Sequence, residues 1–124
     1  MKKLLLLLLL ICLTVHANVE FLNNNNFNNK ISKGIVVVEY WAEWNNANKF
    51  KELKELKDCT VYRACISSCS DAASKYKIKA IPTVIIYDNG EEVARFSPNI
   101  MLQLEATGKD VQSAIDEIVL NKFQ

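Results

Sequence analysis

The chain is almost without histidine: of its 124 residues only His16 is one. This residue belongs to an N-terminal stretch in which two lysines precede an apolar run, residues 4–13, and a small residue, Ala17, follows. That order is typical of a secretory signal peptide, and the run is shorter than the roughly 20 apolar residues that span a bilayer. We therefore expect residues 1–17 to be removed, leaving residues 18–124 as an exported domain, periplasmic or secreted, with no stable membrane anchor.

Without His16 the expected domain contains no histidine, which excludes several kinds of chemistry. No Ser-His or Cys-His nucleophile pair can form. Zinc sites built on histidine are excluded as well. One of the four cysteines also leaves with the N-terminal stretch, and the remaining Cys59, Cys65 and Cys69 are too few for a four-cysteine site. We expect neither a metal nor another cofactor.

An excess of charge of one sign is missing too. The full chain has 15 basic and 14 acidic residues, and loss of the two N-terminal lysines leaves thirteen against fourteen, a formal charge of −1. A near-zero charge without a basic stripe argues against nucleic acid as a partner. The 50% hydrophobic content is enough for one compact core of roughly 100 residues, and we expect a monomer.

The order of strand and helix signals predicts an α/β fold with a mixed sheet. The expected strands are Val19–Leu22, Ile35–Val38, Thr60–Ile66, Val84–Tyr87 and Glu92–Phe96, the last two joined by an Asn89-Gly90 hairpin turn. The expected helices are a short one anchored by Phe27 and Ile31, one from Ala47 to Asp58 with Phe50, Leu53 and Leu56 on one face, one over Asp71–Tyr76, and one over Gly108–Asn121 after a Thr107/Asp110 capping box. Such an order places helices on both faces of the sheet.

Two separated stretches resemble the thioredoxin family. Residues 35–50, IVVVEYWAEWNNANKF, are similar to the family's active-site segment, in which a buried strand leads into W-A-E-W-C-G-P-C-K and a helix. Residues 75–92, KYKIKAIPTVIIYDNGEE, are similar to its second signature, in which Ile-Pro-Thr contains a cis proline. The resemblance covers essentially all of residues 18–124 and implies the thioredoxin fold, a central mixed sheet flanked by helices on both faces.

The two positions that are cysteine in the family are Asn45 and Asn48 here. Thiol-disulfide exchange needs a thiolate and a second thiol that resolves the mixed disulfide, and an amide is neither nucleophile nor leaving group. The resemblance therefore implies a redox-inactive protein with no catalytic residue. One alternative is a weak thiol-disulfide oxidoreductase using Cys65 and Cys69. Those two cysteines could also form a structural disulfide or stay free.

Other positions of the resemblance are retained. Glu39 matches a buried acid of the family, and Arg63 aligns with a basic residue on the neighbouring strand, so we interpret them as a buried charge pair. Trp44, Ile81 and Pro82 match a shallow groove that binds extended substrate through main-chain hydrogen bonds. The partner would then be a protein or an extended peptide, bound in a chaperone-like manner. Alternatively, Pro82 only shapes the turn before its strand.

Residues 97–106, SPNIMLQLEA, stand where the family usually has a short turn. Ser97 and Pro98 suit the cap and first position of a helix. The segment is apolar on more than one side, through Ile100, Met101, Leu102 and Leu104. An apolar insertion in a small domain forms either a lid on the core or a surface for a partner. A structural subunit that docks through this insertion is therefore a further alternative function.

Overall fold

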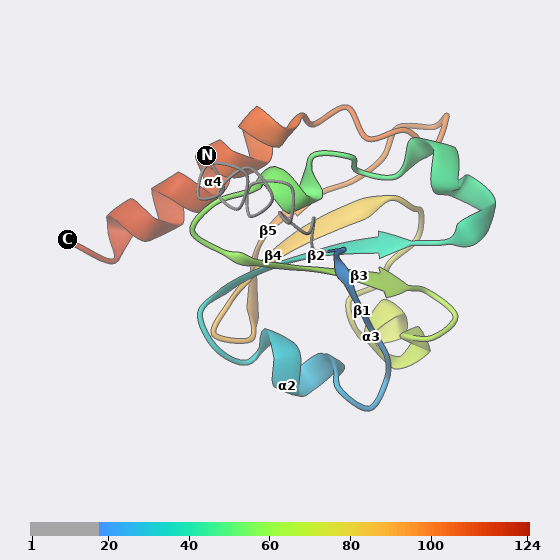
Figure 1. Ribbon diagram of the computed structural model, residues 1–124, viewed down its shortest axis with the longest axis horizontal. Coiled ribbons are helices and arrows are strands. Elements are labelled where there is room, and N and C mark those ends of the chain that lie inside the picture. The colour runs from blue at the N-terminus through green and yellow to red at the C-terminus, as the bar shows by residue number, and fades with distance from the viewer. Residues whose placement is uncertain (1–17) are drawn as a thin grey trace, which may run out of the picture.

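The computed structural model describes residues 18–124, and the expected signal peptide, residues 1–17, lies outside the described residues. Five strands form one sheet in the order β1-β3-β2-β4-β5 (Figure 1). They are β1 (Glu20–Leu22), β2 (Ile35–Trp41), β3 (Thr60–Cys65), β4 (Thr83–Asp88) and β5 (Glu91–Phe96). The first three pair in parallel, and β4 is antiparallel to both β2 and β5. The predicted mixed α/β sheet is confirmed.

Helices cover both faces of this sheet, as predicted. Helices α2 (Phe27–Ile31) and α3 (Ser70–Lys75) lie on one face and α4 (Gly108–Asn121) on the other (Figure 1). Helix α4 begins at the predicted capping box, in which the Thr107 hydroxyl accepts the Asp110 N–H and the Asp110 carboxylate accepts the Thr107 N–H. No helix within residues 18–124 is long and apolar enough to cross a membrane.

The sheet separates two apolar cores, and β2 contributes to both. Val36, Val38 and Tyr40 belong to the core under α2 and α3, whereas Val37 belongs to the core under α4. A continuous apolar run predicts this burial on both faces. On the α2 side the hydroxyls of Tyr40 and Tyr87 are hydrogen-bonded at 2.7 Å. This hydrogen bond ties the carboxyl end of β2, next to the candidate site, to β4.

The predicted helix from Ala47 to Asp58 is wrong. Two short 3₁₀ helices stand in its place, η1 (Glu43–Asn48) and η2 (Leu53–Glu55). The backbone hydrogen bonds around them join residues three apart, as from the Leu56 N–H to the Leu53 carbonyl at 3.3 Å. The apolar residues of this segment are also three apart, which matches the three residues per turn of a 3₁₀ helix better than the 3.6 of an α-helix.

A buried charge pair explains why an α-helix does not form there. The Phe50 N–H donates to Glu39 Oε2 at 2.7 Å, and the Phe50 carbonyl accepts from Arg63 at 2.9 Å. In an α-helix both backbone groups would bond within the helix. Because charged side chains satisfy them instead, the chain stays extended at Lys49, with ψ 152°, and passes directly from η1 to the core.

The helix start suggested by Ser97-Pro98 is also absent. Residues 97–106 form a tight turn closed by an antiparallel bridge between Pro98 and Leu104. Within it, Asn99 Oδ1 accepts the N–H groups of Met101 at 2.9 Å and Gln103 at 3.1 Å. A side-chain acceptor of this kind competes with helical hydrogen bonding and favours a turn.

Candidate functional site

The two asparagines at the family's cysteine positions bind each other and the surrounding backbone. Both lie in η1, directly after β2, and Asn48 Nδ2 donates to Asn45 Oδ1 at 2.8 Å. Asn45 Nδ2 in turn donates to two carbonyl oxygens, of Ile81 at 3.2 Å and of Leu102 at 3.0 Å. One amide thus joins three segments: η1, the turn before β4 and the 97–106 loop.

The three residues of the predicted groove lie at the end of the sheet where β2 ends and β4 begins. The Ile81–Pro82 peptide bond is cis, and Pro82 is buried. Trp44 and Ile81 line one hollow of about 440 Å³, together with Leu102 and residues of α3 and its flanking turns. The Trp44 side chain is 68% exposed. The structure therefore brings Trp44 and the cis-proline turn together around a shallow, mainly apolar hollow.

Ile81 places main-chain groups at the same end of the sheet. Its carbonyl accepts from Asn45, whereas its N–H has no acceptor within residues 18–124. A buried backbone N–H is normally paired. A main-chain donor without a partner is the kind of group with which an added strand pairs in other proteins.

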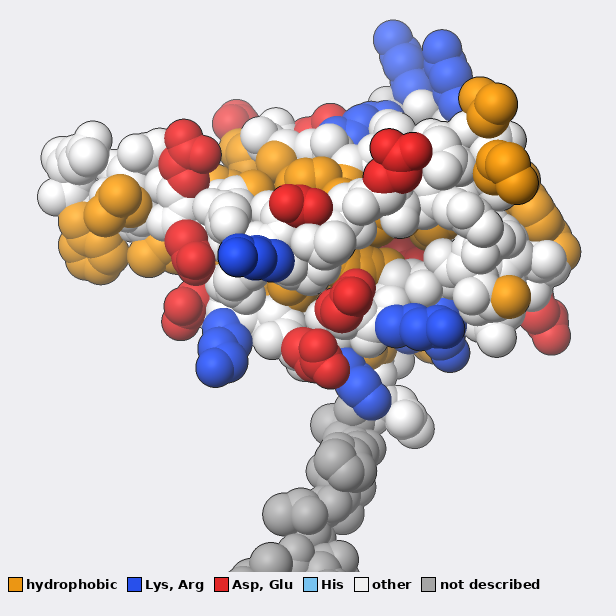
Figure 2. Space-filling model, turned by 90° about the horizontal axis from the view of Figure 1, so that it is seen from above, with side chains coloured by type: hydrophobic (Ala, Val, Ile, Leu, Met, Phe, Trp, Pro, Cys, Tyr) orange, Lys and Arg blue, Asp and Glu red, His pale blue; other side chains and the backbone are white. Residues whose placement is uncertain are grey.

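The 97–106 loop folds back over the site at Leu102 and leaves its tip exposed. Leu102 lines the hollow beside Trp44, and its carbonyl accepts from Asn45 across 57 residues of sequence, so no local pattern predicts this contact. Its φ of +57° is unusual for a residue with a side chain. Ile100 and Met101, at the tip, are 100% and 68% exposed. Figure 2 shows apolar side chains along the end of the molecule where η1 and this loop lie in Figure 1.

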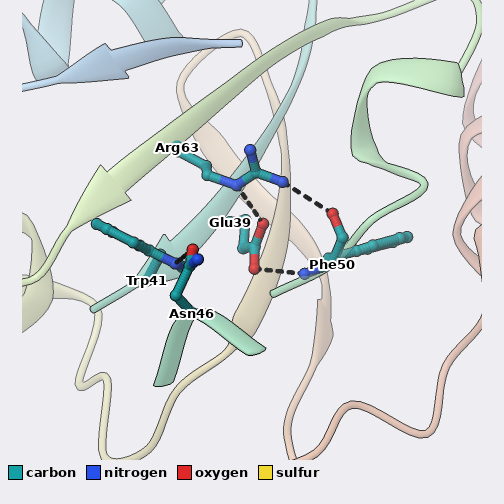
Figure 3. Close-up of polar contacts among 5 residues, drawn as sticks. All are labelled: Glu39, Trp41, Asn46, Phe50 and Arg63. Carbon is teal, nitrogen blue, oxygen red and sulfur yellow. Dashed lines mark hydrogen bonds and ion pairs between the residues drawn. The ribbon is translucent and has the colours of Figure 1, made fainter. Parts of the chain in front are cut away.

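The structure also brings Glu39 and Arg63 together. They face each other on β2 and β3, and Arg63 Nε lies 2.8 Å from Glu39 Oε1 (Figure 3). Glu39 is 0% exposed. Burial raises the pKa of its carboxyl group, and the hydrogen bonds from Phe50 and Arg63 oppose that effect. Both partners contact the backbone of Phe50 rather than Asn45 or Asn48, so the pair organises the chain after η1.

The disulfide considered for Cys65 and Cys69 is not formed. All three cysteines of residues 18–124 are free. Cys69 is 0% exposed in the core at the start of α3, while Cys65 Sγ is hydrogen-bonded to Ser67 Oγ at 3.2 Å. Nor do three His, Cys, Asp or Glu side chains of the described residues gather closely enough to hold a metal ion.

The thiols differ in acidity. Partial burial raises the pKa of Cys65, but the hydrogen bonds from the Ser67 hydroxyl and from the backbone of Ser67 and Ser68 outweigh it and lower the pKa on balance. Burial raises the pKa of Cys59 and of Cys69, each to about 11. Cys65 is therefore the one thiol of the three with an environment that favours reaction.

A five-stranded mixed sheet with an exposed tryptophan and a cis proline at one end of its central strands is typical of a thioredoxin-type domain. The family model described as Thioredoxin matches residues 18–107. The chain belongs to the thioredoxin family.

Comparison with individual proteins agrees with that assignment. The thioredoxin of Chlamydia trachomatis is 30% identical over 83 residues, covering 62% of this chain and 81% of the relative. The thioredoxin of Mycoplasma genitalium is 29% identical over 70 residues, covering 52% and 69%. Among solved structures, a thioredoxin from Malassezia sympodialis has a TM-score of 0.63 at 19% identity, covering 83% of this chain and 97% of its own. A mutant thioredoxin from Halobacterium salinarum has a TM-score of 0.64 at 18% identity, covering 81% and 89%. At these identities the two structures support the fold alone.

Proposed function

We propose that this protein is a redox-inactive member of the thioredoxin family, exported after loss of residues 1–17, that binds extended polypeptide across Trp44, Ile81 and Pro82. The observation that carries the proposal is the position of the Asn45 amide. It stands where the family's thiol would be and donates to the carbonyls of Ile81 and Leu102. The proposed site thus lacks the nucleophile but keeps Trp44, Ile81 and Pro82 as a surface for binding.

Reversible binding needs no thiol. An extended chain can pair with the Ile81 N–H, which has no partner among the described residues, and can bury an apolar side chain in the hollow beside Trp44. Exposed tryptophans next to such hollows often contribute much of the affinity of an interface. The apolar surface here is small, so the proposal is for weak, chaperone-like binding of unfolded segments.

The proposal is tested with a labelled, unfolded polypeptide whose cysteines have been carboxymethylated, so that disulfide exchange is impossible. Fluorescence anisotropy of the label measures binding to residues 18–124. We expect saturable binding that Trp44→Ala weakens about fivefold or more, the loss of about 1 kcal/mol that marks a contributing interface residue. Phe123→Ala is the matched control, because Phe123 is an aromatic residue 84% exposed near the chain's C-terminus.

Two results would contradict the proposal: no binding, or binding that Trp44→Ala and Phe123→Ala affect equally. Circular dichroism of each variant establishes that the fold is intact. Binding that ignores Trp44→Ala but is lost on Met101→Asp would favour the second candidate function, docking through the 97–106 loop. The full exposure of Ile100 and the 68% exposure of Met101 support that alternative.

A further inference from the structure

A second hollow lies beside the candidate groove. It measures about 640 Å³, against about 440 Å³ for the apolar one next to Trp44. Lys79 and Ala80, in the turn before the cis proline, line both hollows. A ligand chain that lies across the cis-proline turn can therefore contact both hollows. The charge of the second hollow then affects which ligands bind in the first.

The second hollow is basic. Its charged lining residues are Lys75, Lys77, Lys79, Arg95 and Glu92, four cations against one carboxylate. Arg95 binds both carboxylate oxygens of Glu92, at 2.7 and 2.9 Å, and also donates to the Tyr76 carbonyl at 2.6 Å. Arg95 and Glu92 thus neutralise each other and fix the wall of the hollow, which leaves the positive charge of the three lysines.

These lysines have no counter-charge of their own. Lys75, Lys77 and Lys79 are all exposed, and none takes part in an ion pair of residues 18–124. Lys77 has a φ of +53°, a conformation that favours glycine or asparagine. Three cations within five residues repel one another, and carboxylates on a ligand would relieve that repulsion.

We propose that the preferred ligands of the site are extended polypeptide segments in which an apolar residue is flanked by acidic ones. The apolar side chain enters the hollow beside Trp44, and the carboxylates lie over Lys75, Lys77 and Lys79. An extended chain advances about 3.3 Å per residue, so the acidic residues stand within a few positions of the apolar one. The inference rests on the proposed function above and names the class of ligand for that same site. Because the three lysines are exposed to solvent, salt screens their attraction for a ligand's carboxylates.

The test compares two fluorescein-labelled peptides with the same two leucines, one carrying three glutamates beside them and the other three glutamines. At about 0.02 M salt, where screening is weak, we expect the glutamate peptide to bind about tenfold tighter, since exposed charge pairs each contribute a few tenths to one kcal/mol. The double variant Lys77→Glu, Lys79→Glu should abolish that advantage, as should about 0.5 M salt. The matched control carries the same change in charge, Lys33→Glu with Lys54→Glu, at two exposed lysines that are also outside the ion pairs of residues 18–124.

The outcomes separate this inference from the proposed function. Equal binding of both peptides, sensitive to Trp44→Ala, would overturn the acidic preference and leave the polypeptide-binding proposal standing. An equal loss of binding in the control double variant and in Lys77→Glu, Lys79→Glu would show attraction to any surface charge and would also overturn the preference. Absence of binding by either peptide would overturn both.

Discussion

At the scale of single residues, the change that matters most is the amide of Asn45 in place of a thiol. The amide has two N–H donors and one oxygen acceptor. It uses its donors on the Ile81 and Leu102 carbonyls and its acceptor on Asn48. A thiol offers one weak donor and could not join these segments. The residue at the family's cysteine position therefore connects the 97–106 loop to the cis-proline turn.

Replacing Asn45 with alanine should loosen that connection. Two backbone carbonyls lose their side-chain donor, and we expect the free energy of unfolding to fall by about 1–3 kcal/mol. Hydrogen exchange of the Leu102 and Gln103 amides should accelerate. The control is Asn46→Ala, because among the described residues the Asn46 side chain accepts only from Nε1 of half-buried Trp41, at 3.1 Å, and has no hydrogen bond to the loop. Unchanged exchange in Asn45→Ala would show that the loop is fixed by other contacts.

Glu39 should make stability depend on pH in a definite direction. Burial raises the pKa of its carboxyl group above the ordinary 4.5, so the folded state binds this proton more tightly than the unfolded chain does. The free energy of unfolding should then fall as pH rises from 4.5 through the raised pKa. Glu39→Gln cannot titrate and should remove this part of the slope. Urea unfolding of both proteins at several pH values gives the difference, and parallel pH profiles would contradict it.

The three cysteines should react in a fixed order. Cys65 is partly exposed with a lowered pKa, whereas the pKa values of Cys59 and Cys69 are raised to about 11. Iodoacetamide at neutral pH should therefore label Cys65 first, and the other two only after denaturation. Mass spectrometry of the peptides gives the order. Rapid labelling of Cys69 in the native protein would reopen the alternative of an oxidoreductase built on Cys65 and Cys69.

At the scale of elements, the segment between β2 and β3 departs most from expectation. The apolar run of β2, the Asn89-Gly90 hairpin and the capping box of α4 were predictable because each depends on residues close together in the sequence. The helix over residues 47–58 was not, because the groups that bind the Phe50 backbone lie 11 and 13 residues away, on Glu39 and Arg63. Long-range hydrogen bonds outweighed a helical pattern there.

The same contrast applies to the site. Trp44, Ile81 and Pro82 could be identified from motifs, since the resemblance fixes where the family's tryptophan and cis proline fall. The Asn45–Leu102 contact could not, because it depends on how an insertion folds back across 57 residues. The basic hollow was missed for a similar reason. In the sequence its lysines are only a short run of charges. They line a hollow because the fold brings them next to β5 and Pro98.

Restoring both cysteines, by Asn45→Cys with Asn48→Cys, tests what the altered element can support. Asn48 Nδ2 and Asn45 Oδ1 lie 2.8 Å apart, so the two side chains point toward each other, and we expect cysteines at these positions to form a disulfide. No α-helix follows η1, however, and without its N-terminus the thiols should keep a pKa near the ordinary value of about 8.5. Reduction of insulin should therefore be slow. Both proteins are compared with Cys65→Ser and Cys69→Ser also present. In that background the protein that keeps Asn45 and Asn48 should not reduce insulin. A pKa below about 7, measured from alkylation rates, would show that η1 activates thiols after all.

At the scale of the whole molecule, the candidate site occupies one end of the sheet. The carboxyl end of β2, the start of β4, η1 and the 97–106 loop meet there (Figure 1), and both hollows open around the cis-proline turn that they share. The rest of the chain supports this end from two buried cores. In the function that we propose, the family's sheet and cis proline support polypeptide binding rather than an exchange reaction.

The most direct test of polypeptide binding at Trp44 and Ile81 is a titration of ¹⁵N-labelled residues 18–124 with the carboxymethylated unfolded polypeptide, followed by two-dimensional NMR. We expect the largest chemical-shift changes at the Ile81 backbone N–H, the Trp44 indole N–H and the Asn45 side-chain amide. The Leu102 backbone amide should show a slightly smaller change. Shifts confined to other parts of the chain, or none at polypeptide concentrations well above the protein's, would contradict the proposed binding.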